Sequence, residues 1–372
     1  MAMQFETKQD EIIFCTKYGI PIRNIWHLLQ YAFGEIPIER LGNVQGVENA
    51  PSIDALFAML LCKFLQQRMR IGLGRNYIDE KHLLRQIRGK ILFTDCVKHQ
   101  TLQQGQAYCQ SQEFSINVPK NQIIRSTLIK LNQIGQFGPD VDESNKIHHT
   151  LRRLIREMEN IDVIELKPEI IRRQQLGRND QDYRLMLFLC ELIILRHMPT
   201  DSSGSTYLPD ITRDELVFHQ IYERFVANFY RQNLPNWKVT PQKRLIWHES
   251  TINQYLPIMK PDLMLVNKNN GDIIILDTKF TKSSLIENQY ANQTFNSSHL
   301  YQLYAYLKTQ EHLSEKHARA TGILLYPTVS KIHLAERISI QDQNFLVQTI
   351  DLSMPWQDIE CKLIDTIELA HM

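Results

Sequence analysis

The stretch LPIMKPDLMLVNKNNGDIIILDTKF, residues 256–280, places two aspartates and a lysine within runs of apolar residues. PDLMLVN and DIIILDTKF have the length and apolar character of buried β-strands. Between them, NKNNGD consists of residues that tolerate left-handed backbone angles, so it predicts a tight turn. We therefore expect an antiparallel hairpin in which Asp262, at the start of the first strand, lies close to Asp277, near the end of the second.

The polar side chains of this hairpin favour metal-dependent chemistry. Side chains alternate along a strand, so Asp277 and Lys279 share one face. Two neighbouring carboxylates repel each other and are costly to bury without a counter-charge. Mg²⁺ removes that cost, because it prefers oxygen ligands and is usually held by one or two carboxylates, waters and substrate phosphates. An Asp followed by Asp-x-Lys on the next strand is the PD-(D/E)xK nuclease pattern.

This pattern predicts that Asp262, Asp277 and Lys279 are catalytic residues for phosphodiester hydrolysis. Asp262 and Asp277 are the expected Mg²⁺ ligands. Lys279 would orient the attacking water or offset charge in the transition state. The alternative interpretation is structural: Asp262 would cap a strand, while Asp277 and Lys279 would form an ion pair at the end of a sheet.

Further candidate site residues flank the hairpin. Gln302 and Tyr306 lie four residues apart in an expected helix and share a face, a spacing similar to that after the catalytic strand of RecB-like nucleases. Glu223, in the helix expected before the sheet, is a candidate for an additional metal-site acid, and Glu215 is the alternative. The candidate DNA-binding residues are Lys243, Arg244, Lys282 and Lys268. For each of these, the alternative is a solvated surface position.

The composition excludes several other classes of protein. The chain has 372 residues and a formal net charge of +1, so a global basic field is absent. Its 6 cysteines are scattered and form no CxxC pair, which argues against a zinc site or disulfide framework and favours a reducing, cytoplasmic setting. There is no signal-peptide pattern, no apolar run long enough to span a membrane and no phosphate-binding GxxxxGK[ST] loop.

The pattern along the chain divides it into segments. We expect a flexible N-terminus over residues 1–19, a mixed α/β domain over 20–165, a helical connector and linker over 166–210, and a second domain over 211–372. In the first domain, Ser52 can cap a helix, and KILFTDCV and AYCQSQEFSI look like strands. In the last segment, the order helix, three strands, helix, strand predicts a mixed sheet flanked by helices, so the fold class is α+β or α/β.

Several segments, taken in order, resemble the McrC family of nuclease subunits in modification-dependent restriction systems of the McrBC type. IPIRNIWHLLQYAFG, residues 20–34, is similar to the opening segment of the family. RGKILF, residues 88–93, resembles its Gly-Arg-Ile-Asp-Phe stretch, with Leu92 in place of the Asp. NQIIRSTL, residues 121–128, resembles another block, and PDLML, ILDTKF, LYQLYAYL and GILLYP follow in the family's order.

The resemblance implies a division of labour. The N-terminal domain would dock into a hexameric ring of an McrB-like AAA+ GTPase and stimulate it, and the C-terminal PD-(D/E)xK endonuclease domain would cut double-stranded DNA near modified cytosines with Mg²⁺. GTP and the modified base would be bound by the partner, so this chain would need only non-specific phosphate contacts. The alternative is a non-catalytic adaptor that activates a partner NTPase and carries a degenerate nuclease fold.

Overall fold

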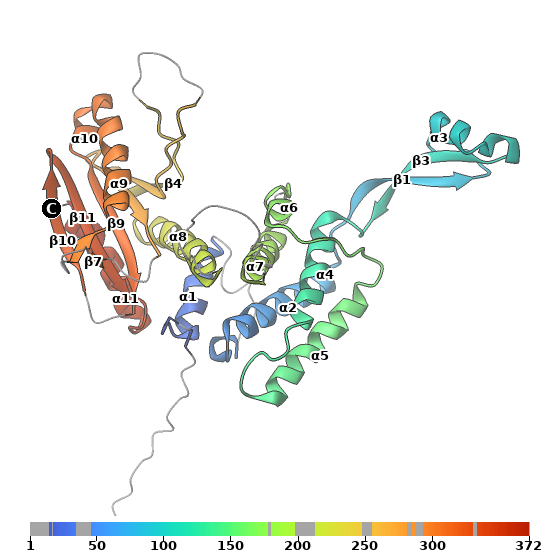
Figure 1. The fold of residues 1–372 in the computed structure, drawn as a ribbon, viewed down its shortest axis with the longest axis horizontal. Coiled ribbons are helices and arrows are strands. Elements are labelled where there is room, and N and C mark those ends of the chain that lie inside the picture. Colours follow the sequence, from blue (N-terminus) through green and yellow to red (C-terminus); the bar gives the residue numbers. More distant parts are fainter. Residues whose placement is uncertain are drawn as a thin grey trace, which may run out of the picture. The chain divides into compact units, whose positions relative to one another are not determined.

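The computed structural model describes residues 15–16, 18–34, 46–177, 180–197, 213–247, 255–280, 285–287, 293–329 and 333–371. The chain divides into two compact units. We call Met1–Leu56 together with Thr200–Met372 the terminal unit, and Phe57–Pro199 the middle unit. Figure 1 shows the elements of each unit.

A six-stranded mixed sheet forms the centre of the terminal unit. Its strand order is β10-β11-β9-β6-β5-β4, in which β9 pairs in parallel with both β6 and β11 and the remaining neighbours are antiparallel. The strands are β4 (Trp237–Pro241), β5 (Leu263–Asn267), β6 (Ile273–Thr278), β9 (Thr321–Thr328), β10 (Ala335–Ile340) and β11 (Gln343–Asp351). A separate pair is formed by β7 (Leu285–Glu287) and β8 (Gln293–Phe295).

Helices cover both faces of this sheet, which explains why β6 is buried along its whole length. The α9 helix packs through Leu303, Tyr306 and Leu307 against a core that includes Ile273 and Ile275 of β6. The α8 and α11 helices also contact the sheet, and α1 packs on α8. The helices of this unit are α1 (Ile22–Ala32), α8 (Arg213–Asn233), α9 (Ser297–Gln310), α10 (Glu315–Ala318) and α11 (Trp356–His371).

The predicted hairpin is present, and its turn has the expected backbone. Gly271 has a φ of 78°, and its N–H donates to Asn267 O at 2.9 Å. Positive φ is inexpensive for glycine, so this residue lets the chain reverse between β5 and β6. Asn296, which begins α9, accepts hydrogen bonds from the N–H groups of Ser298 and His299, and this cap fixes the start of the helix.

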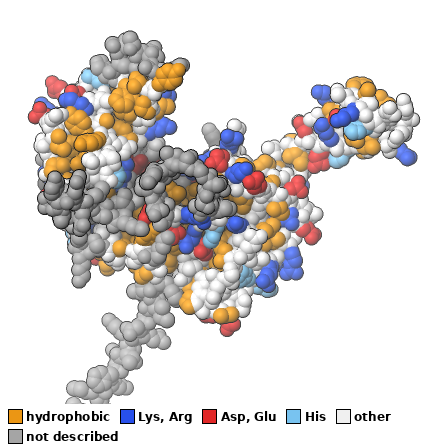
Figure 2. Space-filling model, in the orientation of Figure 1, with side chains coloured by type: hydrophobic (Ala, Val, Ile, Leu, Met, Phe, Trp, Pro, Cys, Tyr) orange, Lys and Arg blue, Asp and Glu red, His pale blue; other side chains and the backbone are white. Residues whose placement is uncertain are grey.

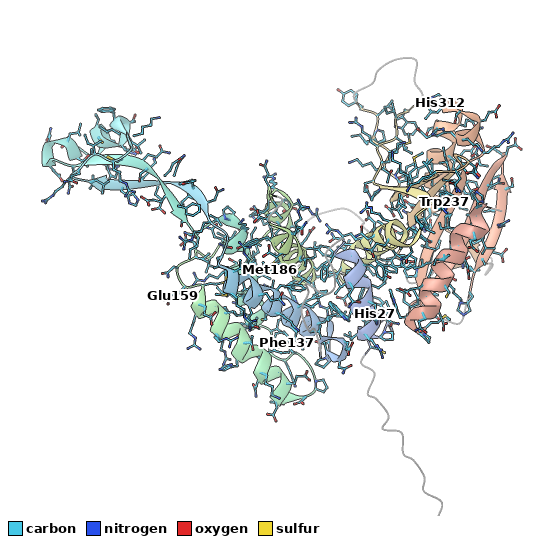
Figure 3. All side chains as sticks on the ribbon, turned by 180° about the vertical axis from the view of Figure 1, so that it is seen from behind. His27, Phe137, Glu159, Met186, Trp237 and His312 are labelled. Carbon is cyan, nitrogen blue, oxygen red and sulfur yellow. The ribbon has the colours of Figure 1, made fainter. Side chains whose placement is uncertain are left out.

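The middle unit combines helices with a small three-stranded sheet. The helices are α2 (Ile53–Ile71), which begins at the boundary of the two units, α3 (Phe93–Lys98), α4 (Pro119–Asn132), α5 (Val141–Glu157), α6 (Pro168–Arg172) and α7 (Gln181–His197). The sheet has the order β1-β3-β2, with β1 (Asn76–Leu84), β2 (Lys90–Ile91) and β3 (Ala107–Ser115). Phe137 and Met186 are buried among the helices of this unit (Figure 3).

The mixed α/β class, the hairpin and the Ser52 cap are confirmed; Ser52 Oγ accepts from the N–H of Ala55 at 3.1 Å. One local prediction is wrong: most of KILFTDCV forms helix α3 instead of a strand. Leu92 ends the short β2 pairing, and the N–H of Cys96 then donates to its carbonyl at 3.0 Å. Strands β10 and β11 and helix α11 were not predicted.

The compact units divide the chain differently from the predicted segments. Residues 20–34 were expected in the first domain, but they belong to the terminal unit, where the Asn24 amide donates to Leu352 O and Met354 O. The reason is that α1 packs on α8 and supplies part of that core. Residues 198–210 of the predicted connector and linker, and the first fourteen residues of the predicted flexible N-terminus, lie outside the described residues.

Two predictions about the class of protein can be compared with the described part of the chain. Within it, no helix is long and apolar enough to cross a membrane. All six cysteines lie in it, and each is a free thiol.

Candidate active site

The sheet register brings Asp262 and Asp277 together. In the antiparallel β5–β6 pair, Leu263 is opposite Leu276, so the next positions outward are Asp262 and Asp277. Directly opposite residues of an antiparallel pair have Cβ atoms about 5 Å apart. Both aspartates are buried, with 9% and 2% of their surfaces exposed. The sequence prediction that these two carboxylates lie side by side therefore agrees with the fold.

Asp262 is held by hydrogen bonds from two neighbouring strands. Its Oδ2 accepts from the backbone N–H of Thr278 at 2.7 Å and from Thr278 Oγ1 at 2.6 Å. Its Oδ1 accepts a longer bond, 3.3 Å, from Gln242 Nε2 at the end of β4. One carboxylate oxygen is thus fully committed to the protein, while Oδ1 retains the capacity to bind another group.

Asp277 and Lys279 lie on the same side of the strand, as predicted from their spacing. Lys279 Nζ is 2.5 Å from Asp277 Oδ2, so the two side chains form a buried ion pair. Burial and the neighbouring charge of Asp262 raise the pKa of Asp277 to about 6, and the Lys279 ammonium only partly opposes this rise. The lysine thus offsets only part of the cost of burying two neighbouring carboxylates, and a bound metal cation would offset more of it.

The α9 helix supplies the predicted Gln–Tyr pair to the same site. Lys279 Nζ donates to Gln302 Oε1 at 2.9 Å, and Gln302 Nε2 donates to Tyr306 Oη at 2.7 Å. Tyr306 Oη in turn donates to Lys260 O at 3.4 Å. This chain of hydrogen bonds connects α9 to both strands of the hairpin and fixes the position of the lysine.

Of the two candidate acids on α8, Glu223 lies near the aspartates. Glu223 Oε1 accepts from Gln242 Nε2 at 2.6 Å, and the same amide reaches Asp262. Burial, followed by the charge of Asp262, raises the pKa of Glu223. Glu215 is eight residues earlier on the helix, a displacement of roughly 12 Å along its axis, and is buried in the first turn of α8.

Two residues near the site were missed by the sequence analysis. Gln242 joins Glu223 to Asp262, and no periodic pattern marks a residue that follows the end of a strand. His219 lies one turn before Glu223, with its Nδ1 4.0 Å from Glu223 Oε2. Burial lowers the pKa of His219, while the charge of Asp262 opposes this effect and that of Lys279 adds to it. The spacing of four residues between His219 and Glu223 could have indicated a shared helix face.

The candidate DNA-binding residues lie at different ends of the sheet. Lys243 and Arg244 are exposed directly after Gln242, at the end of the sheet that carries the aspartates. Lys268 lies at the other end of β5, where its Nζ donates to Pro235 O at 2.7 Å. Lys268 therefore lies away from the aspartates, because β5 carries it to the far end of the hairpin. Lys282 lies outside the described residues.

The donor set is compatible with a hard cation. Among the described residues, no three His, Cys, Asp or Glu side chains form a ready metal cluster. Mg²⁺ does not require one, since it is often bound through one or two carboxylates and keeps several waters. Asp262 Oδ1 accepts only a long hydrogen bond, and Asp277 contacts only the Lys279 ammonium, so the two carboxylates offer oxygen donors from adjacent strands.

Comparisons with known proteins identify the family of the chain. Residues 15–327 match the family described as McrBC 5-methylcytosine restriction system component. The chain is 26% identical, over 353 residues, to the type IV methyl-directed restriction enzyme EcoKMcrBC of Escherichia coli K12, and the match covers 94% of this chain and 97% of that protein.

Two solved structures from Thermococcus gammatolerans are also similar. One, a half-complex from a tetradecameric assembly of McrB AAA+ hexamers with bound McrC, has 17% identity and a TM-score of 0.48, and the match covers 94% of this chain and 75% of that chain. The other, a cryo-EM structure of the McrBC complex, has 20% identity and a TM-score of 0.38, with 56% and 58% covered. Because the family match extends over most of its length, the chain belongs to the family of McrBC 5-methylcytosine restriction system components.

Proposed function

We propose that this chain is the McrC-type nuclease subunit of its restriction system and hydrolyses DNA phosphodiesters with Mg²⁺. The observation that carries the proposal is the grouping of Asp262, Asp277 and Lys279 at one end of the hairpin, with Lys279 bound to Gln302. Asp262 and Asp277 would hold the metal, which when bound supplies Lewis-acid stabilisation of the phosphate charge.

The protein's own groups have separable tasks in this reaction. Thr278 holds one oxygen of Asp262, so the carboxylate cannot rotate away from the site. Lys279 has three donor hydrogens. Asp277 and Gln302 orient its ammonium group, and the hydrogen that remains can be donated to the attacking water or to a phosphate oxygen. Such a preorganised cation stabilises charge that develops in the transition state.

The middle unit is the part that we propose binds the partner, an McrB-like AAA+ GTPase hexamer. Its small sheet leaves many large apolar side chains exposed, which is typical of surfaces that bind another protein. These side chains are Tyr77, Leu83, Ile87, Phe93, Val97, Leu102 and Phe114. Figure 2 shows hydrophobic side chains among basic ones on this sheet and its helix. Membership of a two-component family and the lack of a phosphate-binding loop in this sequence support placing GTP hydrolysis in the partner.

We further propose that the DNA substrate is a duplex carrying modified cytosine and that the partner reads the modification. The family description names 5-methylcytosine. The exposed Lys243 and Arg244 beside the site are suited to phosphate contacts, which carry no sequence information themselves. One such nuclease site cuts one strand, so a double-strand break would need two copies of the chain.

Plasmid cleavage tests the proposal directly. The full chain, its cognate GTPase, GTP and Mg²⁺ are combined with methylated or unmethylated plasmid, and wild type is compared with Asp277→Ala. A matched control is Asp272→Ala, which removes the half-buried carboxylate at the opposite end of β6. We expect wild type and Asp272→Ala to cut methylated DNA and Asp277→Ala to be inactive while it still stimulates GTP hydrolysis. If GTP hydrolysis is stimulated but wild type never cuts, the chain is a non-catalytic adaptor.

A further inference from the structure

Strands β4 and β5 continue beyond the sheet as a two-stranded ribbon, which we define as residues 243–247 and 255–260. A bridge pairs Leu245 with Met259 and preserves the register in which Pro241 is opposite Leu263. Farther out, Trp247 Nε1 donates to Pro257 O at 2.7 Å. The ribbon therefore begins immediately after Gln242 and ends immediately before Pro261 and Asp262, at the candidate active site.

One face of the ribbon is anchored to α9. Leu245 and Met259 are buried, with 3% and 5% exposed, in the core that includes Leu307. From α9, Gln310 Nε2 donates to Ile246 O at 2.9 Å. These contacts hold the ribbon at its root, so its position relative to the active site is defined by packing as well as by chain connection.

The other face of the ribbon exposes one basic pair and one apolar pair. The same register places Arg244 opposite Lys260 and Ile246 opposite Ile258. Ile246 is 72% exposed and Ile258 is 52% exposed, and both basic residues are exposed as well. Among the described carboxylates, none forms an ion pair with Arg244 or Lys260. Figure 2 shows hydrophobic side chains at the surface around this part of the terminal unit.

We infer that this face of the ribbon binds duplex DNA beside the cut phosphate, with Arg244 and Lys260 on the backbone and the Ile246–Ile258 pair inserted as an apolar wedge in the minor groove. The inference rests on the proposed nuclease function. Arg244 is two residues of extended chain, about 7 Å, from Gln242. A DNA backbone with one phosphate in the active site could therefore also contact the basic pair. Paired apolar side chains that enter the minor groove unstack a base step and bend the duplex.

The charges favour DNA over a protein as the occupant. Two copies of the chain that met symmetrically through this face would bring the cations of one copy toward those of the other. DNA instead neutralises both cations and releases its own counterions. The basic pair is thus complementary to the DNA backbone. The apolar pair, which lies farther from the metal site, is complementary to the apolar interior of the groove.

The test uses two double variants of the full chain in complex with its GTPase. Arg244→Ala with Lys260→Ala removes the basic pair, and Ile246→Ser with Ile258→Ser removes the wedge. The matched controls are Lys268→Ala and Ile340→Ser, which change exposed residues at the far end of β5 and on the edge strand β10. DNA affinity is measured against salt in an Asp277→Ala background, which leaves the DNA intact, and permanganate reports unstacked thymines.

We expect the basic-pair variant to lower the slope of log affinity against log salt by about two, one for each lost phosphate contact. The wedge variant should lose the permanganate-reactive thymines, and in the Asp277 wild-type background it should cut about tenfold more slowly. Both variants should stimulate GTP hydrolysis normally.

Unchanged cutting and thymine reactivity in both variants would overturn the inference while leaving the nuclease proposal intact. A loss of self-association or of partner binding, with DNA contacts unchanged, would also overturn it. Failure of wild type to cut would instead remove the proposed function on which it rests.

Discussion

All six residues of β6 in the terminal unit are buried, whereas all nine residues of β1 in the middle unit are exposed or only half-buried. A strand that helices cover on both faces can hold charged groups only if neighbours compensate them. Asp262 and Asp277 meet that condition through Thr278 and Lys279. Burial therefore makes β6 suited to precise chemistry, and exposure makes β1 and β3 suited to contact with another chain.

The small sheet is held from its base instead of through a core. Its own buried cluster contains only Cys96, Ala107 and Cys109 with a few half-buried neighbours. At the base, the Asn121 amide donates to Gly74 O at 2.9 Å and to Ile116 O at 2.7 Å, which flank β1 and β3. Tyr183 Oη donates to Asn121 Oδ1 at 2.6 Å and accepts from Gly74 N at 2.7 Å. This arrangement fixes the direction of the sheet; the short α3 helix packs on β3, and β1 is left without a buried residue.

The largest effect should come from the lysine of the buried site. Lys279→Met removes the ammonium group that contacts Asp277 and Gln302. We expect DNA cutting to fall by about 10³-fold, the effect of removing one preorganised charge-stabilising donor, with partner binding unchanged. Single-turnover cleavage by the full complex measures the loss, and Lys268→Met is the matched control. Cutting within about threefold of wild type would show that Lys279 acts only as a structural counter-charge.

The second prediction concerns the exposed sheet. Tyr77 and Phe114 are cross-strand neighbours with ring centroids 5.1 Å apart, and they are 64% and 56% exposed. Replacing both with Ser should weaken binding to the GTPase by about tenfold to a hundredfold, because exposed aromatic residues dominate protein interfaces. Titration of GTPase stimulation measures the change, and circular dichroism checks the fold.

Ile340→Ser, an exposed apolar change in the terminal unit, is the control for this pair. If the control weakens partner binding as much as the Tyr77 and Phe114 changes, the proposed division between a chemical unit and a docking unit is wrong. If only the aromatic pair matters, and DNA cutting falls in proportion to complex formation, the division is strengthened.

The difference between the two sheets also explains what could be predicted from the sequence. The hairpin was predictable because apolar runs, a glycine turn and the Asp-x-Lys spacing are all local signals, and the register then places Asp262 beside Asp277. The joining of Gln242 to Glu223 was not, since it depends on how α8 packs on β4. In the middle unit, the half-buried positions of β1 include the polar residues Glu80 and His82, so apolar residues do not alternate along the strand. For this reason β1 was missed, and part of KILFTDCV was assigned to the wrong element.

A smaller effect is expected from the polar base of the docking sheet. Asn121→Ala leaves Gly74 O and Ile116 O without the amide donor and deprives Tyr183 of its acceptor. Buried polar groups without partners cost about 2 kcal/mol here, so the free energy of unfolding of the middle unit should fall by that amount. Hydrogen exchange should accelerate in β1 and β3 but not in β6.

The neighbouring Gln122 provides the control for this change. Its amide donates to Asn117 Oδ1 at 2.8 Å at a partly exposed position, so Gln122→Ala should change the free energy of unfolding by no more than about 0.5 kcal/mol. Equal acceleration of exchange in β6 would mean that the two units do not unfold separately.

The smallest expected effect is on the pH dependence of stability in metal-free protein. It compares the two ends of β6, where Asp277 and Asp272 lie. The pKa of Asp277 is raised to about 6, chiefly by burial. The folded protein therefore binds more protons than the unfolded chain between about pH 4 and 6, and stability falls as pH rises through that range. At the other end, the side-chain hydrogen bond from Lys316 lowers the pKa of Asp272, so its contribution is present above the unfolded pKa and is lost as pH falls through the folded pKa.

Thermal unfolding with EDTA from pH 4 to 8 should therefore show a loss of about 1–2 kcal/mol that Asp277→Asn removes, because the amide is neutral at every pH in this range. Asp272→Asn should leave that loss in place and slightly lower stability at pH 7. Added Mg²⁺ should restore the stability of wild type at pH 7 but not that of Asp277→Asn, since a ligand that binds only the folded state stabilises it. If Asp277→Asn retains the pH-dependent loss of stability, a group other than Asp277 causes it, and the contrast between the two ends of β6 is wrong.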